Sequence, residues 1–168
     1  MSLEWLPFEL RPEPTPTLRP EDDYLQTAWR DNVYPLAKKL GLEMKLPGVS
    51  PQPYTRLAHE GMEFAKEHGK GNEYAHALFA AFFQSGEDIG KIDVLSRTAG
   101  VIGLNADEFR RSLEEGTYRE RTQGLLRQAR MQMVTAVPTF IIGRQRVSGL
   151  YPAEVLAQIV DEQVRNSR

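Results

Sequence analysis

Helical periodicity dominates the chain between residues 21 and 133. In the first segment the apolar residues recur at the three- and four-residue spacing of one helix face, and they are Leu25, Trp29, Val33 and Leu36. Pro35 predicts a kink within this segment, and Gly41 predicts its end. Five further helices are predicted over residues 55–68, 72–85, 92–101, 105–116 and 117–133.

Two of these helices carry specific signals. Asn72 is expected to cap its helix, and the apolar run Ala77–Phe83 is expected to form the buried part of that helix. The aromatic residues expected to pack in the core are Phe79, Phe82 and Phe83. Asn105 and Glu108 have the spacing of a capping box, which predicts that a helix begins there.

The two ends of the chain have the patterns of strands. Leu3 and Trp5 alternate with polar residues, which predicts a short strand over Leu3–Leu10, and Arg11–Pro20 contains four prolines, which predicts an extended linker. Near the other end, the β-branched and aromatic run Thr139–Ile142 predicts a strand. A turn is predicted at residues 143–145, a return strand at 146–148, and a last helix from Pro152. The content is therefore α/β, with most residues helical.

Composition excludes several classes of protein. The 168 residues suit one domain, or a small domain with a helical insertion. Lysine and arginine number 21 against 23 acidic residues, a net charge of −2 without a basic block, so no nucleic-acid partner is expected. No apolar run is long enough to span a membrane, and Met1–Leu6 lacks the basic start and apolar stretch of a secretory signal. No membrane association and a cytoplasmic location are therefore expected.

The cysteine count is zero, which is the most informative number in the composition. These residues cannot form a disulfide, a thiolate nucleophile, an iron–sulfur site or a cysteine zinc site. The three histidines, His59, His68 and His76, have no metal-binding spacing, and no phosphate-binding loop is present. Neither a metal nor a cofactor is expected.

Acidic residues offer the next candidate chemistry. General acid–base pairs could be drawn from Glu60, Glu63, Glu67, Glu114 and Glu115. These carboxylates lie between lysines and arginines on predicted helix faces, so solvated surface positions are expected for them. No catalytic residue is predicted in this chain.

The segment Ala136–Gly143 stands out because Pro138 lies where a helix passes into a buried strand. The bond between Val137 and Pro138 can be cis at modest cost, although a trans proline at a strand start is the commoner arrangement. A cis proline would turn the preceding backbone outward, so that Val137 could pair with an extended peptide. The two residues Val137 and Pro138 are therefore the predicted substrate-binding site.

The run Val137–Arg144, followed by Val147–Leu156, closely resembles the C-terminal end of the DsbA-like thioredoxin-fold family, in the FrnE branch. That family includes 2-hydroxychromene-2-carboxylate isomerases and kappa-class glutathione transferases. Segments resembling the inserted helical domain and second strand of the family are Thr55–His59, Glu63–Lys66, His76–Phe83, Gly86–Gly90 and Trp5–Leu10. The resemblance implies a thioredoxin-like fold with a helical insertion, and a cis Val137–Pro138 bond facing a groove between the hairpin and the insertion.

The chain departs from the family pattern at its start. Family members carry a strand and a helix with a CxxC pair, or a serine variant, before the strand that we place at Leu3–Leu10. The resemblance implies that residues 1–18 and 134–168 form the thioredoxin-like portion and that residues 19–133 form the inserted helical domain. We expect a longer gene product whose N-terminal strand and active-site helix are missing here, with a naturally short paralogue as the alternative.

Three functions follow from the resemblance. The first is a thiol–disulfide oxidoreductase family member that is inactive without its redox cysteines and binds a peptide or small thiol. The second is a relative of the glutathione-dependent isomerases and transferases. The third is a non-catalytic peptide-binding or assembly protein, in which an unpaired strand edge favours a homodimer with Leu3–Leu10 near the interface. An all-α interaction module would fit the helices alone, but the predicted hairpin argues against it.

Overall fold

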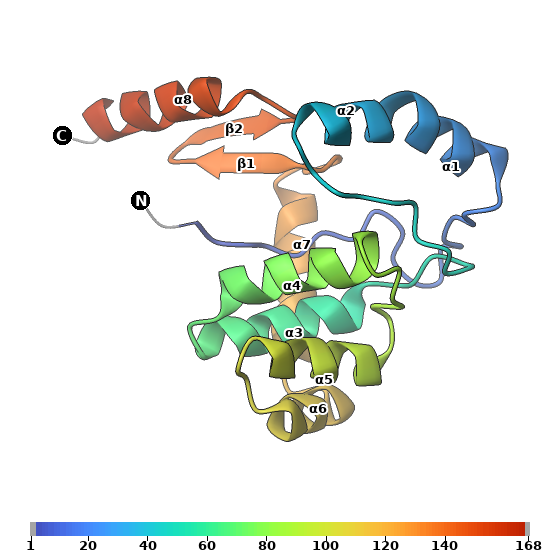
Figure 1. The fold of residues 1–168 in the computed structure, drawn as a ribbon. Helices are drawn as coiled ribbons and strands as arrows, with labels where there is room; N and C mark the ends of the chain where they lie inside the picture. Colours follow the sequence, from blue (N-terminus) through green and yellow to red (C-terminus); the bar gives the residue numbers. More distant parts are fainter. Residues whose placement is uncertain (1–2, 167–168) are drawn as a thin grey trace. The chain divides into compact units, whose positions relative to one another are not determined.

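The computed structural model describes residues 3–166 and is helix-rich, with one two-stranded sheet (Figure 1). Met1 and Ser2, which belong to the segment inspected for a secretory signal, lie outside the described residues. In chain order the elements are α1 (Asp23–Ala28), the π-helical turn η1 (Trp29–Val33), α2 (Tyr34–Lys39), α3 (Arg56–Glu67), α4 (Gly71–Phe83), α5 (Ile92–Val101), α6 (Ala106–Glu115), α7 (Arg119–Met131), β1 (Thr139–Ile142), β2 (Gln145–Ser148) and α8 (Ala153–Asn166).

The chain divides into two compact units, Met1–Leu126 and Arg127–Arg168, and the boundary falls within α7. The first unit contains the helices from α1 to α6 and the N-terminal segment. The second contains the hairpin and α8. The assignment of residues 1–18 and 134–168 to a thioredoxin-like portion, with 19–133 as an insertion, stays a prediction.

In the first unit, α3 packs against α4, α5 and α6, and α5 also packs against α4 and α6. Their apolar faces form a core whose largest fully buried apolar side chains are Tyr74, Leu95, Phe109 and Leu113. The predicted helix ends are confirmed at two positions. The side chain of Asn105 accepts hydrogen bonds from the backbone N–H groups of Asp107 and Glu108, and Gly116 ends α6 in the left-handed conformation.

The first predicted helix is observed as α1, η1 and α2, joined without a break. Pro35 lies in the first turn of α2, so it has no backbone N–H to donate to the carbonyl of Asp31. The widened turn η1 comes directly before it and carries the buried side chain of Trp29. Gly41 follows α2 with φ of +67°, as expected of a glycine at a helix end.

The prediction of a strand over Leu3–Leu10 is wrong. The described residues of this segment are extended but pair with no other strand. Instead, the indole Nε1 of Trp5 donates a 2.9 Å hydrogen bond to the side-chain oxygen of Asn72, and its ring meets that of Phe79 edge-on with centroids 5.6 Å apart. Alternation of polar and apolar residues therefore reflects docking of one aromatic ring on α4, not a sheet.

The start of α4 and the burial of its residues also differ from the prediction. The helix begins at Gly71, and the Asn72 side chain bonds Trp5 instead of capping the helix. Within Ala77–Phe83 only Ala81 is buried, and Phe79 is 45% exposed. Phe82, in contrast, packs against the core as expected.

In the second unit, β1 and β2 form the predicted antiparallel hairpin, with Phe140 opposite Val147 and Ile142 opposite Gln145. The turn is one residue shorter than predicted, because Gln145 already belongs to β2. Gly143 has φ of +60°, which suits a tight hairpin turn. Figure 1 shows α8 beside the hairpin, where it packs against β1. Among the described helices, none is long and apolar enough to cross a membrane.

Candidate functional site

The loop that carries the predicted site begins at the end of α7. Met133 has φ of +54°, a left-handed conformation that is uncommon outside glycine. Its N–H donates to the carbonyl of Arg130 at 2.8 Å, and the N–H of Val134 donates to the carbonyl of Ala129 at 3.0 Å. These bonds close the last helical turn and direct the chain into the segment that leads to β1.

Pro138 lies directly before β1, and the Val137–Pro138 peptide bond is cis in the structure. The carbonyl oxygen of Pro138 accepts a 2.8 Å hydrogen bond from the N–H of Gly149. This bond extends the hairpin by one residue pair beyond β1 and β2. The hydroxyl of Thr139 donates to the carbonyl of Ala136 at 2.7 Å. Backbone and side-chain bonds therefore hold the loop on both sides of Pro138.

Val137 is one residue of this loop whose backbone groups stay unpaired. The residue is half-exposed, with an exposed fraction of 50%. Within residues 3–166, neither its N–H nor its carbonyl has a hydrogen-bond partner. An unpaired donor and acceptor on one half-exposed residue can pair with an extended peptide by strand addition. The structure thus brings Val137 and Pro138 together at the start of a strand, whereas the predicted groove toward the helical insertion stays a prediction.

A second cluster of functional groups joins α3 to α7, and its burial differs from the surface positions predicted from the sequence. Glu60 and Glu63 were expected on a solvated face, but both side chains are fully buried. The reason is that α7 brings Arg119 and Arg121 over this face of α3, where they lie within ion-pair distance of the two carboxylates. The spacing of Glu60, Glu63 and Glu67 places three carboxylates on one helix face. This was the signal in the sequence, because carboxylates that become buried require basic partners.

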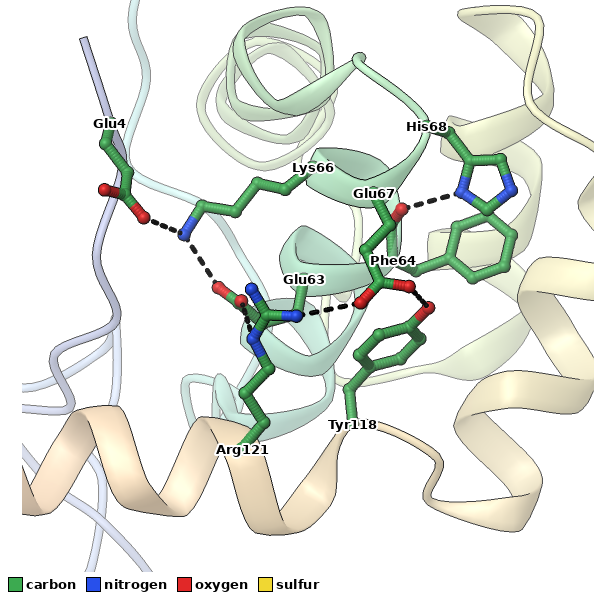
Figure 2. Close-up of polar contacts among 8 residues, drawn as sticks. All are labelled: Glu4, Glu63, Phe64, Lys66, Glu67, His68, Tyr118 and Arg121. Atoms are coloured by element: carbon green, nitrogen blue, oxygen red, sulfur yellow. Dashed lines mark hydrogen bonds and ion pairs between the residues drawn. The ribbon is translucent and has the colours of Figure 1, made fainter.

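Figure 2 shows the centre of this cluster, in which Glu63 is held by two cations. Lys66 Nζ donates to Glu63 Oε1 at 2.8 Å, and Arg121 Nε lies 2.9 Å from Glu63 Oε2. Lys66 Nζ also donates to Glu4 Oε1 at 3.0 Å, which ties the N-terminal segment to α3. Both oxygens of the buried carboxylate therefore face a positive charge.

The rim of the cluster is formed by Glu67. It accepts hydrogen bonds from Arg121 Nη1 at 2.8 Å and from the hydroxyl of Tyr118 at 2.6 Å. Partial burial, and then the neighbouring Glu67 carboxylate, raises the pKa of Tyr118 to about 12, so this phenol stays protonated at neutral pH. A depression of about 300 Å³ is lined by Glu4, Lys66, Glu67 and Arg121.

Glu60 is held more loosely than Glu63. Its Oε1 lies 3.6 Å from Arg56 Nε and 3.8 Å from Arg119 Nε, and neither of its oxygens accepts a hydrogen bond within residues 3–166. Burial raises the pKa of Glu60, and the two guanidinium groups oppose that shift. The acidic and basic groups of the whole cluster neutralise one another. We therefore interpret the cluster as a clamp between α3 and α7 and not as a catalytic centre.

The three histidines do not converge on a site. His59 lies against the N-terminal segment, where burial lowers its pKa to about 4 and a hydrogen bond with the Phe8 backbone acts against that shift. The ring of His68 stacks on Phe64 with centroids 4.2 Å apart, and His76 is exposed. In the part of the chain that the structure describes, no three His, Asp or Glu side chains are arranged to hold a metal ion.

Comparison with solved structures identifies the type of fold. The structure superposes on 2-hydroxychromene-2-carboxylate isomerase with a TM-score of 0.70 at 18% identity, covering 86% of this chain and 68% of that one. It superposes on the "probable DsbA oxidoreductase SCO1869" of Streptomyces coelicolor with a TM-score of 0.74 at 26% identity. That match covers 86% of this chain and 62% of the Streptomyces protein. The fold is therefore thioredoxin-like and of the DsbA type.

Sequence comparison identifies the family. YwbO of Bacillus subtilis (strain 168) is 43% identical over 165 residues, which cover 97% of this chain and 82% of YwbO. A model of the DSBA-like thioredoxin domain matches residues 1–161, a stretch that includes Val137, Pro138 and the whole α3–α7 cluster. The chain belongs to the family of DSBA-like thioredoxin domains.

Proposed function

We propose that this chain is a thiol–disulfide oxidoreductase-type member of the family that binds an extended peptide at Val137 and Pro138. The redox thiol is not supplied by these 168 residues, which contain no cysteine. Binding without thiol chemistry is therefore the activity assigned to the chain itself.

One observation carries the proposal. Val137 is half-exposed, and neither its N–H nor its carbonyl has a partner among the described residues, shortly before β1 begins. A peptide strand that paired there would form two backbone hydrogen bonds with one residue. The bond between Gly149 and Pro138 holds the loop in place beforehand, so little ordering would accompany binding.

The test is an affinity measurement with a defined probe. We choose fluorescein-labelled insulin B chain whose thiols are carboxymethylated, because it is unfolded and cannot exchange thiols. Val137→Pro removes the backbone donor, and Val137→Ile is the matched control because it keeps both the donor and a β-branched side chain. We expect Val137→Pro to weaken binding about three- to tenfold, the equivalent of one backbone hydrogen bond, and Val137→Ile to change it by less than about twofold. Equal affinities for the two variants would contradict the proposal.

A turnover assay separates binding from catalysis. Insulin reduction by dithiothreitol should proceed at the uncatalysed rate in the presence of the pure chain, because no thiolate nucleophile is available. Turnover by a sample of verified mass would overturn this part of the proposal. A glutathione-dependent isomerase or transferase is the alternative within the family, and saturable glutathione binding unaffected by Val137→Pro would favour it. The cytoplasmic location expected from the sequence stays a prediction.

A further inference from the structure

The second unit differs in charge from the rest of the chain. Residues 127–153 contain four arginines and no lysine, aspartate or glutamate, so this stretch has a charge of +4. Because the whole chain has a net charge of −2, all other residues together carry −6. Val137 and Pro138, where we propose that a peptide binds, lie near the middle of the positive stretch. A surface of one charge sign attracts ligands of the opposite sign.

Three of these arginines lie close to the start of the loop that contains Val137. Arg127 and Arg130 are three residues apart on α7, so they share one face of that helix. Arg146 belongs to β2, and its guanidinium group contacts the carbonyl of Gln132, directly after α7. The end of α7 and the hairpin therefore bring three positive charges to the point where the loop begins.

No acidic side chain of the described chain neutralises these three arginines. All three residues are exposed, and none of them forms an ion pair within residues 3–166. The arginines near the start of α7 differ in this respect, because Arg119 lies within ion-pair distance of Glu60 and Arg121 within that of Glu63. The charges at the end of α7 and on β2 therefore remain available to an anionic ligand.

We infer that the peptide bound at Val137 is acidic, and that Arg127, Arg130 and Arg146 select it. This inference rests on the peptide binding proposed above and adds the substrate class. Backbone pairing at Val137 does not depend on the sequence of the peptide, so a preference among peptides requires side-chain contacts or charge. A guanidinium group supplies such a contact, because it binds a carboxylate through two parallel hydrogen bonds.

The geometry of the hairpin sets the range over which these charges act. Pro138 pairs with Gly149, and Ile141 lies opposite Arg146. Three residues separate the two pairs, which is about 10 Å along a strand at about 3.3 Å per residue. This distance is about the Debye length in 0.1 M salt. The arginine charges therefore reach a peptide at the loop in dilute salt and are screened in concentrated salt.

A local role is the alternative explanation for Arg127 and Arg130. Basic side chains stabilise the C-terminal end of a helix, where they meet the negative end of the helix dipole. That role affects the stability of α7 and does not distinguish an acidic peptide from a neutral one. The preference among peptides therefore separates the two explanations.

Three fluorescein-labelled peptides test the preference. Each has a central Val-Thr-Val run with two residues on either side, which are Glu in the first peptide, Gln in the second and Lys in the third. In about 20 mM salt the Glu peptide should bind about five- to tenfold tighter than the Gln peptide, and the Lys peptide should bind most weakly. In about 0.5 M salt the difference between Glu and Gln peptides should fall below about twofold. Equal affinities for these two peptides in dilute salt would overturn the inference.

A double variant assigns the preference to the arginines. Arg127→Gln combined with Arg130→Gln removes two charges and no ion pair of the described chain, so the preference for the Glu peptide should fall to about twofold while the affinity for the Gln peptide stays unchanged. Arg127→Lys with Arg130→Lys is the matched control, which keeps both charges and should keep most of the preference. An unchanged preference in the Gln variant would contradict the inference. The wild-type ranking and its salt dependence decide the question even where a variant unfolds.

Val137→Pro separates a failure of this inference from a failure of the proposed function. It should weaken binding of the Glu and Gln peptides by the same factor, because it removes a backbone donor that both use. Equal Glu and Gln affinities that both fall in Val137→Pro would retain the binding site and overturn its acidic preference. An affinity for the Glu peptide that Val137→Pro leaves unchanged would overturn both proposals, because the peptide would then bind elsewhere. Displacement of the Glu peptide by a lower concentration of a short oligothymidylate would overturn the inference in favour of general polyanion binding.

Discussion

The N–H of Gly149 donates a 2.8 Å hydrogen bond to the carbonyl oxygen of Pro138, and this contact joins the end of the hairpin to the loop that precedes it. Pro138 has no N–H of its own, so its carbonyl is the one backbone group through which β2 can hold it. The neighbouring residue, Val137, is half-exposed. The peptide binding that we propose at this loop would therefore depend on the position of Gly149.

Gly149→Ala should loosen the loop. Gly149 has φ of +104°, which an alanine adopts only with strain, although an added Cβ would meet nothing closer than Tyr151 at 4.0 Å. We expect a loss of about 1–2 kcal/mol, seen as faster amide exchange at Phe140 and Val147. Gly48→Ala is the control, since a Cβ there meets nothing within 4 Å and the backbone is not left-handed. Equal exchange rates in the two variants would show that Gly149 is not held in this conformation.

Helix ends and the hairpin were predictable because local chemistry determines them. Asn105 and Gly116 mark the ends of α6 through bonds made within a few residues, and Gly143 with Arg144 sets a two-residue turn. The absence of a strand at Leu3–Leu10 was not predictable, because whether an extended segment forms a strand depends on a neighbour far away in sequence. The burial of Glu63 was missed for the same reason, since the arginine opposite it comes from another helix.

The α3–α7 clamp should be sensitive to loss of one cation. Arg121→Leu leaves the buried Glu63 with Lys66 as its remaining ion-pair partner within residues 3–166, and an undercompensated buried charge is costly. We expect the free energy of unfolding to fall by about 1–3 kcal/mol in urea titrations. Arg111→Leu, at an exposed position of α6 with no ion pair in the described chain, should change it by less than about 0.5 kcal/mol. Similar losses for both variants would mean that the clamp contributes nothing specific.

Gly61 should tolerate no side chain, because it lies in the crowded centre of the core. A Cβ at this position would lie 2.5 Å from Phe109 Cζ and 2.6 Å from the hydroxyl of Tyr74, which is fully buried. Gly61→Ala should therefore destabilise the chain by about 1–3 kcal/mol. Gly100→Ala, whose Cβ meets Ala106 at an ordinary 3.6 Å, should gain up to about 1 kcal/mol from reduced chain entropy. Thermal unfolding of the two variants checks the opposite signs.

His59 should make stability depend on pH. Its pKa is about 4 in the folded chain and near 6.5 when unfolded, so the unfolded state binds more protons between these values. The contribution of His59 to the free energy of unfolding should therefore be constant above about pH 6.5. It should fall by about 1–3 kcal/mol as the pH drops toward 4. His59→Gln should remove this part of the decline. Urea unfolding across that range measures it, and parallel curves for the two proteins would rule out His59 as the cause.

The central claim, that Val137 pairs with an extended peptide, is tested most directly by the exchange rate of its own amide proton. Carboxymethylated insulin B chain is added at saturating concentration, and exchange is followed residue by residue. We predict that the Val137 amide becomes protected while the amides of α8 exchange as before. Bound peptide with unchanged exchange at Val137 would contradict the account.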